Sequence, residues 1–109
     1  MTFKVGKLSP IRVGPHYVSF GVIEGVDAEK AHGMWYPQEH MIRLEKEFPS
    51  GSRAAEVVLH EVIHAVFTNG CINPKHGEEH IVSMLGLGLI QVIRDNPEFI
   101  KWLQATVTK

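Results

Sequence analysis

The sequence predicts an α+β fold in which a small antiparallel sheet from the N-terminal half packs on helices from the C-terminal half. In the first half, apolar and polar residues alternate and β-branched and aromatic side chains are frequent. In the second half, apolar residues recur at helical spacing. The chain has 109 residues, the size of one compact domain, so we expect a single domain over residues 1–109.

Strands are expected in three segments of the first half. Residues 16–25 (HYVSFGVIEG) alternate, are rich in β-branched and aromatic side chains, and follow a Gly-Pro pair. Residues 31–36 (AHGMWY) and 41–45 (MIRLE) flank the segment PQEH, which is typical of a turn. These last two strands are therefore expected to form an antiparallel hairpin.

Three helices are expected in the second half. The first covers residues 53–69, between a Ser-Gly-Ser stretch that offers N-cap chemistry and a glycine that ends it. The second covers residues 78–94 and carries apolar side chains along one face. Asn96 would cap a short last helix with Pro97 at its first position. The side chains that the last two helices are expected to bury are Val82, Leu85, Leu89, Val92, Phe99, Trp102 and Leu103.

Composition restricts the class of function. The net charge is -1 and basic residues form no stripe, which argues against binding to nucleic acid. Cys71 is the only cysteine, so an intrachain disulfide is impossible and a reducing compartment is favoured. The start of the chain lacks the apolar region of a signal peptide, and no apolar run reaches the roughly 20 residues that span a bilayer. We expect a cytoplasmic protein that binds neither nucleic acid nor a membrane.

The segment VVLHEVIHAVF carries an HExxH motif on the first predicted helix. Residues four apart share a helix face, so His60 and His64 project together and can bind one metal ion. Glu61, about 100° around the axis, would lie beside the metal and accept a proton from its bound water. Zinc suits imidazole and carboxylate ligands and leaves a position open for water. The competing interpretation is a metal-free helix whose wet face carries two histidines and an acid.

A zinc site of this kind needs a third protein ligand, which the next helix is expected to supply. We prefer Glu79, because its face continues through Ser83 and Gly86, small residues that would let the two helices approach closely. A glycine inside a helix costs roughly 1 kcal/mol relative to alanine, and close packing would explain Gly86 or Gly88. A large neighbour such as Trp35 or Trp102 would also explain them. The other candidate ligands are Glu78, His76 and His80.

The ordered combination of MIRL, LHEVIHAVF and EEHIVSMLGLGLIQVIRDNP resembles small phage and prophage-type zinc metallopeptidase-like proteins of the gluzincin class, related to the ImmA/IrrE family. The resemblance implies a minimal zincin-like fold. It also implies that zinc is held by His60, His64 and a glutamate, here Glu79, with Glu61 as general base. Finally, it implies that Met41–Leu44 is an edge strand along which an extended protein or peptide substrate could pair.

The sequence departs from the family pattern in the groups around the metal. Larger gluzincins supply a downstream His or Tyr that stabilises the oxyanion, for which His76 and Tyr36 are candidates here. Ser83 stands where relatives often have an Asp or Asn that orients a ligand histidine. Two functions therefore compete. One is a zinc-dependent metallopeptidase, and the other is a non-enzymatic phage or prophage accessory protein. The latter would keep zinc for stability or partner binding, with a fourth ligand such as His76 or Cys71.

Overall fold

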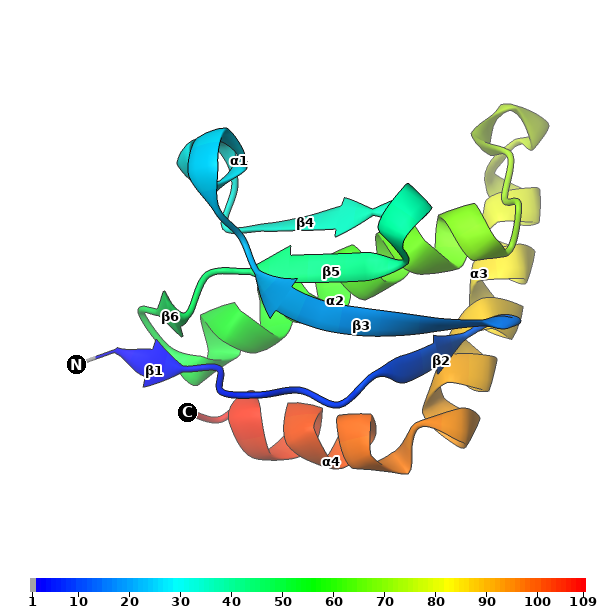
Figure 1. Ribbon diagram of the computed structural model, residues 1–109. Helices are drawn as coiled ribbons and strands as arrows, with labels where there is room; N and C mark the ends of the chain where they lie inside the picture. Colours follow the sequence, from blue (N-terminus) through cyan, green and yellow to red (C-terminus); the bar gives the residue numbers. More distant parts are fainter. Residues whose placement is uncertain (1) are drawn as a thin grey trace.

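The computed structural model describes residues 2–109 and has the predicted α+β architecture (Figure 1). The strands are β1 (Phe3–Lys4), β2 (Ile11–Val13), β3 (His16–Val22), β4 (Gly33–Tyr36), β5 (Met41–Leu44) and β6 (Glu47–Phe48). The helices are α1 (Gly25–Lys30), α2 (Gly51–Asn69), α3 (Glu78–Asp95) and α4 (Pro97–Thr106), with short 3₁₀ turns at Pro37–Glu39 and Pro74–His76. No helix among these residues combines the length and apolar character that crossing a bilayer requires.

The main sheet is mixed rather than purely antiparallel. Its strand order is β2-β3-β5-β4, and β3 pairs with β5 in parallel while the other two pairs are antiparallel. The predicted hairpin is confirmed, because β4 pairs with β5 through the turn at Pro37–Glu39 and His40, whose φ is 50°. The parallel pair arises because α1 and β4 separate β3 from β5 and bring the chain back before β5 begins. β1 and β6 form a separate two-stranded ladder.

The expectation that Met41–Leu44 is an edge strand is wrong. This segment is β5, which lies between β3 and β4, and its Ile42 and Leu44 side chains are buried. The edges of the four-stranded sheet are β2 and β4. An extended peptide therefore cannot pair with β5, since both sides of this strand are already occupied.

α2 packs behind the sheet and provides one side of the core (Figure 1). The helix begins two residues earlier than predicted, and the Ser50 hydroxyl accepts a hydrogen bond from the Arg53 amide (3.1 Å). It ends before Gly70, as predicted. The core side chains of α2 with no exposed surface are Ala54, Val58, Val62 and Ala65. They pack with Val18 and Ile42 of the sheet in one cluster of buried hydrophobic residues.

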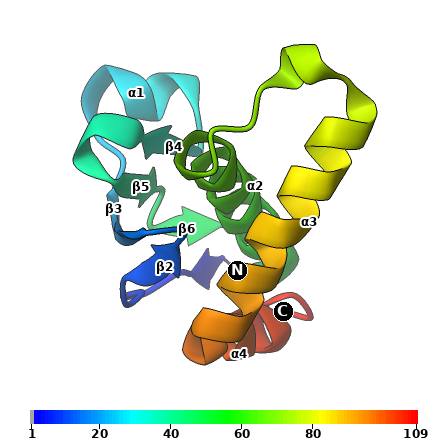
Figure 2. The same cartoon turned by 90° about the vertical axis from the view of Figure 1, so that its right-hand side faces the viewer.

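α3 approaches α2 closely at Gly88. A Cβ placed on Gly88 would lie 2.5 Å from Cγ1 of Val66 in α2, whereas a Cβ on Gly86 would have no atom within 4 Å. The close packing expected at Gly86 is therefore found at Gly88, and the neighbour is a valine rather than a tryptophan. Val92 is the only buried side chain of α3, and Val82, which was expected in the core, is 57% exposed. The start of α3 diverges from α2 (Figure 2), although Ile81, Met84 and Leu85 still pack against the hydrophobic core.

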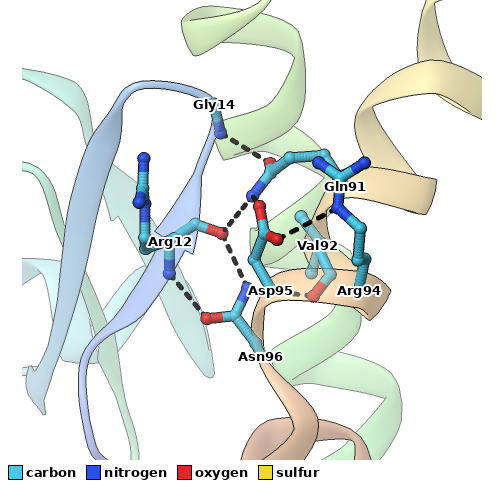
Figure 3. A network of polar contacts seen from close by, with 7 residues as sticks. All are labelled: Arg12, Gly14, Gln91, Val92, Arg94, Asp95 and Asn96. Carbon is cyan, nitrogen blue, oxygen red and sulfur yellow. Dashed lines mark hydrogen bonds and ion pairs between the residues drawn. The ribbon is translucent and has the colours of Figure 1, made fainter.

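Side chains from the end of α3 cover the outer edge of β2 (Figure 3). Asn96 accepts a hydrogen bond from the Arg12 amide (2.7 Å) and donates to the Arg12 carbonyl (2.8 Å), as a neighbouring strand would. Gln91 accepts from the Gly14 amide (2.7 Å) and donates to the Arg12 carbonyl (3.1 Å). Hydrogen bonds from Arg94 and Gln91 also lower the pKa of the Asp95 carboxyl.

Asn96 occupies the predicted N-cap position of α4, but its side chain makes no capping hydrogen bond. Besides its two bonds to Arg12, the amide donates to the Val92 carbonyl (2.9 Å). A single buried amide thus joins β2 to the junction between α3 and α4. Phe99 is buried as expected, whereas Trp102 and Leu103 are half-buried.

The two glycines of α3 are expected to respond in opposite ways to alanine. Gly86→Ala should raise the free energy of unfolding by about 0.5–1 kcal/mol, because alanine favours the helix and the site has room. Gly88→Ala should lower it, because the methyl group would overlap Val66. Urea denaturation of both variants at low protein concentration measures the difference. Equal effects at the two positions would contradict the observed packing of α3.

Removing the Asn96 amide should destabilise the fold. Asn96→Ala leaves the Arg12 amide without its acceptor, a loss of about 1–3 kcal/mol in the free energy of unfolding. Gln104→Ala removes an exposed amide from α4 and serves as the control, with an expected change below about 0.5 kcal/mol. Urea denaturation compares the two variants, and equal stability would show that the amide does not hold β2 in place.

Candidate metal centre

One turn of α2 brings together the three residues of the motif. The potential ligand atoms of His60, Glu61 and His64 all lie within 4.8 Å of one another. The two imidazole rings lie edge to face, with centroids 4.9 Å apart. His60 Nε2 lies 3.9 Å from a Glu61 carboxylate oxygen, and the side chain of His60 is 65% exposed while that of Glu61 is 9% exposed. The cluster therefore presents two accessible imidazoles beside a buried carboxylate.

β4 buries Glu61 by packing along one side of α2. At the start of the strand, a Cβ on Gly33 would meet Val57 at 2.9 Å. At its end, Trp35 Nε1 donates to the Thr68 hydroxyl (3.0 Å). Val57, Glu61 and Thr68 are four and seven residues apart and share one helix face, so Glu61 lies on the side of α2 that β4 covers. The Thr68 hydroxyl also donates to the His64 carbonyl (3.2 Å), which ties the end of β4 to the motif itself.

A surface pocket of about 330 Å³ opens beside His60 and Glu61. It lies between α2 and the segment that leads into β4, and His32 and Gly33 contribute to its wall. Glu56, which the sequence reasoning did not single out, also lines it. The sequence could have identified Glu56 through its position four residues before His60, because this spacing places the two side chains on the same helix face. Its carboxylate is paired with Arg53 (3.0 Å).

Glu79 lies outside the cluster. Its carboxylate accepts a hydrogen bond from the Ser83 hydroxyl (3.4 Å), four residues further along α3. It precedes Gly88, the point of contact with α2, by nine residues, or about 13 Å along the helix axis. Glu78 is also exposed in this projecting turn. The reason for preferring Glu79, a close approach at Gly86, does not hold, because Gly86 faces open space.

The remaining candidates also lie apart from the motif. The rings of His76 and His80 pack against each other, with centroids 4.9 Å apart, at the start of α3. Tyr36 donates from its hydroxyl to Asp27 (2.6 Å), and this hydrogen bond raises the pKa of Tyr36. Because side chains alternate along a strand and Trp35 reaches α2, Tyr36 lies on the opposite face of β4. Cys71 is exposed and does not belong to the cluster.

Comparisons with protein families, curated proteins and solved structures give no match for this chain. The zincin-like fold and the resemblance to the ImmA/IrrE family therefore stay predictions. The chemistry of the donor set can be compared with zinc directly. Two imidazoles four residues apart, with a carboxylate within 4.8 Å, are the nitrogen and oxygen donors that zinc prefers. The motif residues fit the metal, and the identity of its third protein ligand is open to experiment.

The purified protein is expected to bind about one zinc ion per chain. His60→Ala and His64→Ala should each reduce the zinc content strongly, because each removes one of the two imidazole donors in the cluster. Glu79→Ala and Glu78→Ala form a matched pair, and a loss confined to Glu79→Ala would identify Glu79 as the third ligand. Inductively coupled plasma mass spectrometry measures the stoichiometry. Wild-type protein that takes up no zinc on reconstitution would make the motif an ordinary exposed helix face.

Proposed function

We propose that the chain is a cytoplasmic zinc-dependent metallopeptidase that hydrolyses peptide bonds in a protein or peptide substrate. The main support for this proposal is the cluster of His60, Glu61 and His64, in which both imidazoles are accessible and the carboxylate is buried beside them. The resemblance to phage and prophage-type metallopeptidases supports the same activity. His60 and His64 would hold the zinc, and Glu79 would be the third ligand. To bind the metal, Glu79 would give up its hydrogen bond with Ser83.

Glu61 is proposed as the general base. Zinc bound at the cluster would polarise the scissile carbonyl and lower the pKa of the attacking water. Glu61 would accept a proton from that water and then deliver it to the leaving amine. The covering strand β4 restricts the carboxylate, because the helix face that carries Glu61 packs under Gly33 and Trp35. A fixed carboxylate beside an accessible metal position is the arrangement that this chemistry needs.

The outer edge of β4 is proposed to pair with the substrate, in place of the β5 edge that the sequence suggested. The Glu45 amide donates to the His32 carbonyl (3.0 Å), so these two residues form a hydrogen-bonded pair of the antiparallel ladder. Such pairs alternate along the strand, and Gly33 and Trp35 therefore direct their N–H and C=O groups outward. An extended peptide on this edge would run beside the pocket at His60 and Glu61.

The separation of Glu79 from the HExxH cluster favours a second candidate function. A zinc ion held only by His60, His64 and groups other than Glu79 would serve stability or partner binding, as in a non-enzymatic phage or prophage accessory protein. The pocket beside the cluster is small and open, so the chain offers little of the enclosure that a peptidase cleft provides. Under this function, chelation of zinc would lower the melting temperature and abolish no activity.

Glu61→Gln tests the peptidase. The variant should retain wild-type zinc content and melting temperature, because glutamine keeps the shape of the side chain. It should lose cleavage by a factor of about 10² or more, because the base is gone. Cleavage of a random peptide library by zinc-loaded protein, read by mass spectrometry, is the measurement, and Glu98→Gln on the exposed surface of α4 is the control. No cleavage by the zinc-loaded wild type, together with a melting temperature that chelation lowers, would establish the accessory function instead.

A further inference from the structure

α3 lies at the outside of the molecule (Figure 2), and several of its large apolar side chains are exposed. Their exposed fractions are 57% for Val82, 67% for Leu87, 61% for Ile90 and 52% for Ile93. Val82, Gly86, Ile90 and Ile93 recur at intervals of three and four and form one stripe, which we name the outer face of α3. Clusters of exposed apolar side chains of this kind mark interaction sites in soluble proteins.

Gly86 lies at the middle of the outer face, and no contact within residues 2–109 requires a glycine at this position. A Cβ at this position would have no atom within 4 Å, in contrast to Gly88, where Val66 excludes one. Glycine inside a helix costs about 1 kcal/mol relative to alanine, so a position with room for a methyl group is an unfavourable place for it. A glycine at the centre of an apolar face does permit the backbone of another helix to approach closely.

We propose that the outer face of α3 pairs with the same face of a second copy of this chain, with the two helices antiparallel and crossing at Gly86. The face is self-complementary about that residue, as a two-fold interface requires. Val82 and Ile90 lie four residues before and after Gly86. A two-fold axis at Gly86 therefore brings Val82 level with the partner subunit's Ile90, and both leave water on contact.

The charges at the two ends of α3 set the direction of the pairing. Glu78 lies eight residues before Gly86, and Arg94, whose side chain is 69% exposed, lies eight residues after it. In an antiparallel pair, Glu78 is level with Arg94 of the partner subunit, so unlike charges meet at both ends. In a parallel pair, each acidic end would meet the other acidic end. The helix macrodipoles also favour the antiparallel direction.

The proposed contact uses no residue that is assigned to zinc binding or catalysis. The outer face, which consists of Val82, Gly86, Ile90 and Ile93, contains neither Glu79 nor any residue of the HExxH cluster, which lies on α2. α3 has 18 residues and is about 27 Å long, so the contact can extend over several helical turns. A pair of single helices is smaller than the standard interface of about 800 Å² per partner, and we expect dissociation in the micromolar range.

Sedimentation velocity over about 5 to 200 µM protein tests for the dimer, since this range brackets a micromolar dissociation constant. The mass should rise from one chain to two as the concentration increases. Ile90→Glu should stay monomeric throughout, because it places a charge in the apolar contact. Val26→Glu changes an equally exposed apolar residue on α1 and should dimerise like the wild type. A wild type that stays monomeric at the highest concentration, or equal behaviour of the two variants, would overturn the proposal.

Disulfide formation tests the crossing point and the direction. In a Cys71→Ser background, Gly86→Cys should oxidise to a covalent dimer, because the two-fold axis places both copies of residue 86 together. Val82→Cys should not, because its counterpart lies beyond the crossing point in an antiparallel pair. Non-reducing electrophoresis gives the yields. Equal yields at both positions would indicate parallel helices, and no covalent dimer at either position would exclude pairing along the outer face.

Discussion

The packing of α2 against the sheet is the constraint on which the candidate site depends. Val58 and Val62 have no exposed surface, and each lies two residues before a histidine of the motif. Two residues turn an α-helix by about 200°, so burying the valines forces His60 and His64 outward. Glu61 lies between these directions and comes under β4. The same hydrophobic contacts that stabilise the fold therefore set the accessibility of the two imidazoles and the burial of the carboxylate.

The features that sequence reasoning predicted correctly depend on local patterns. The span of α2, the hairpin of β4 and β5, and the grouping of the motif residues all follow from periodicity, turn residues and helix geometry. The parallel pairing of β3 with β5 depends on contacts between distant segments, and no pattern within either strand specifies its neighbours. The choice between Gly86 and Gly88 likewise required the position of Val66, which spacing within α3 does not reveal.

The two edges of the main sheet are treated differently, and the difference bears on function. Exposed strand edges invite pairing with other chains, and proteins usually cover them. At β2, the side chains of Asn96 and Gln91 take the places of a neighbouring strand. At β4, no hydrogen bond within residues 2–109 engages the outward groups of Gly33 and Trp35. The uncovered edge is thus the one that lies beside the pocket at His60 and Glu61.

The orientation of α3 has two consequences. Because the side of α3 that carries Gly88 packs on α2, the outer face on the opposite side has no neighbour within the described chain. The first turn of α3 diverges from α2, which leaves Glu79 apart from the motif. A partner on the outer face would cover apolar surface along α3, whereas zinc would draw Glu79 toward α2, so both ligands would act on the same helix. Their effects on α3 are therefore expected to be thermodynamically linked, with each ligand changing the affinity for the other by the same factor.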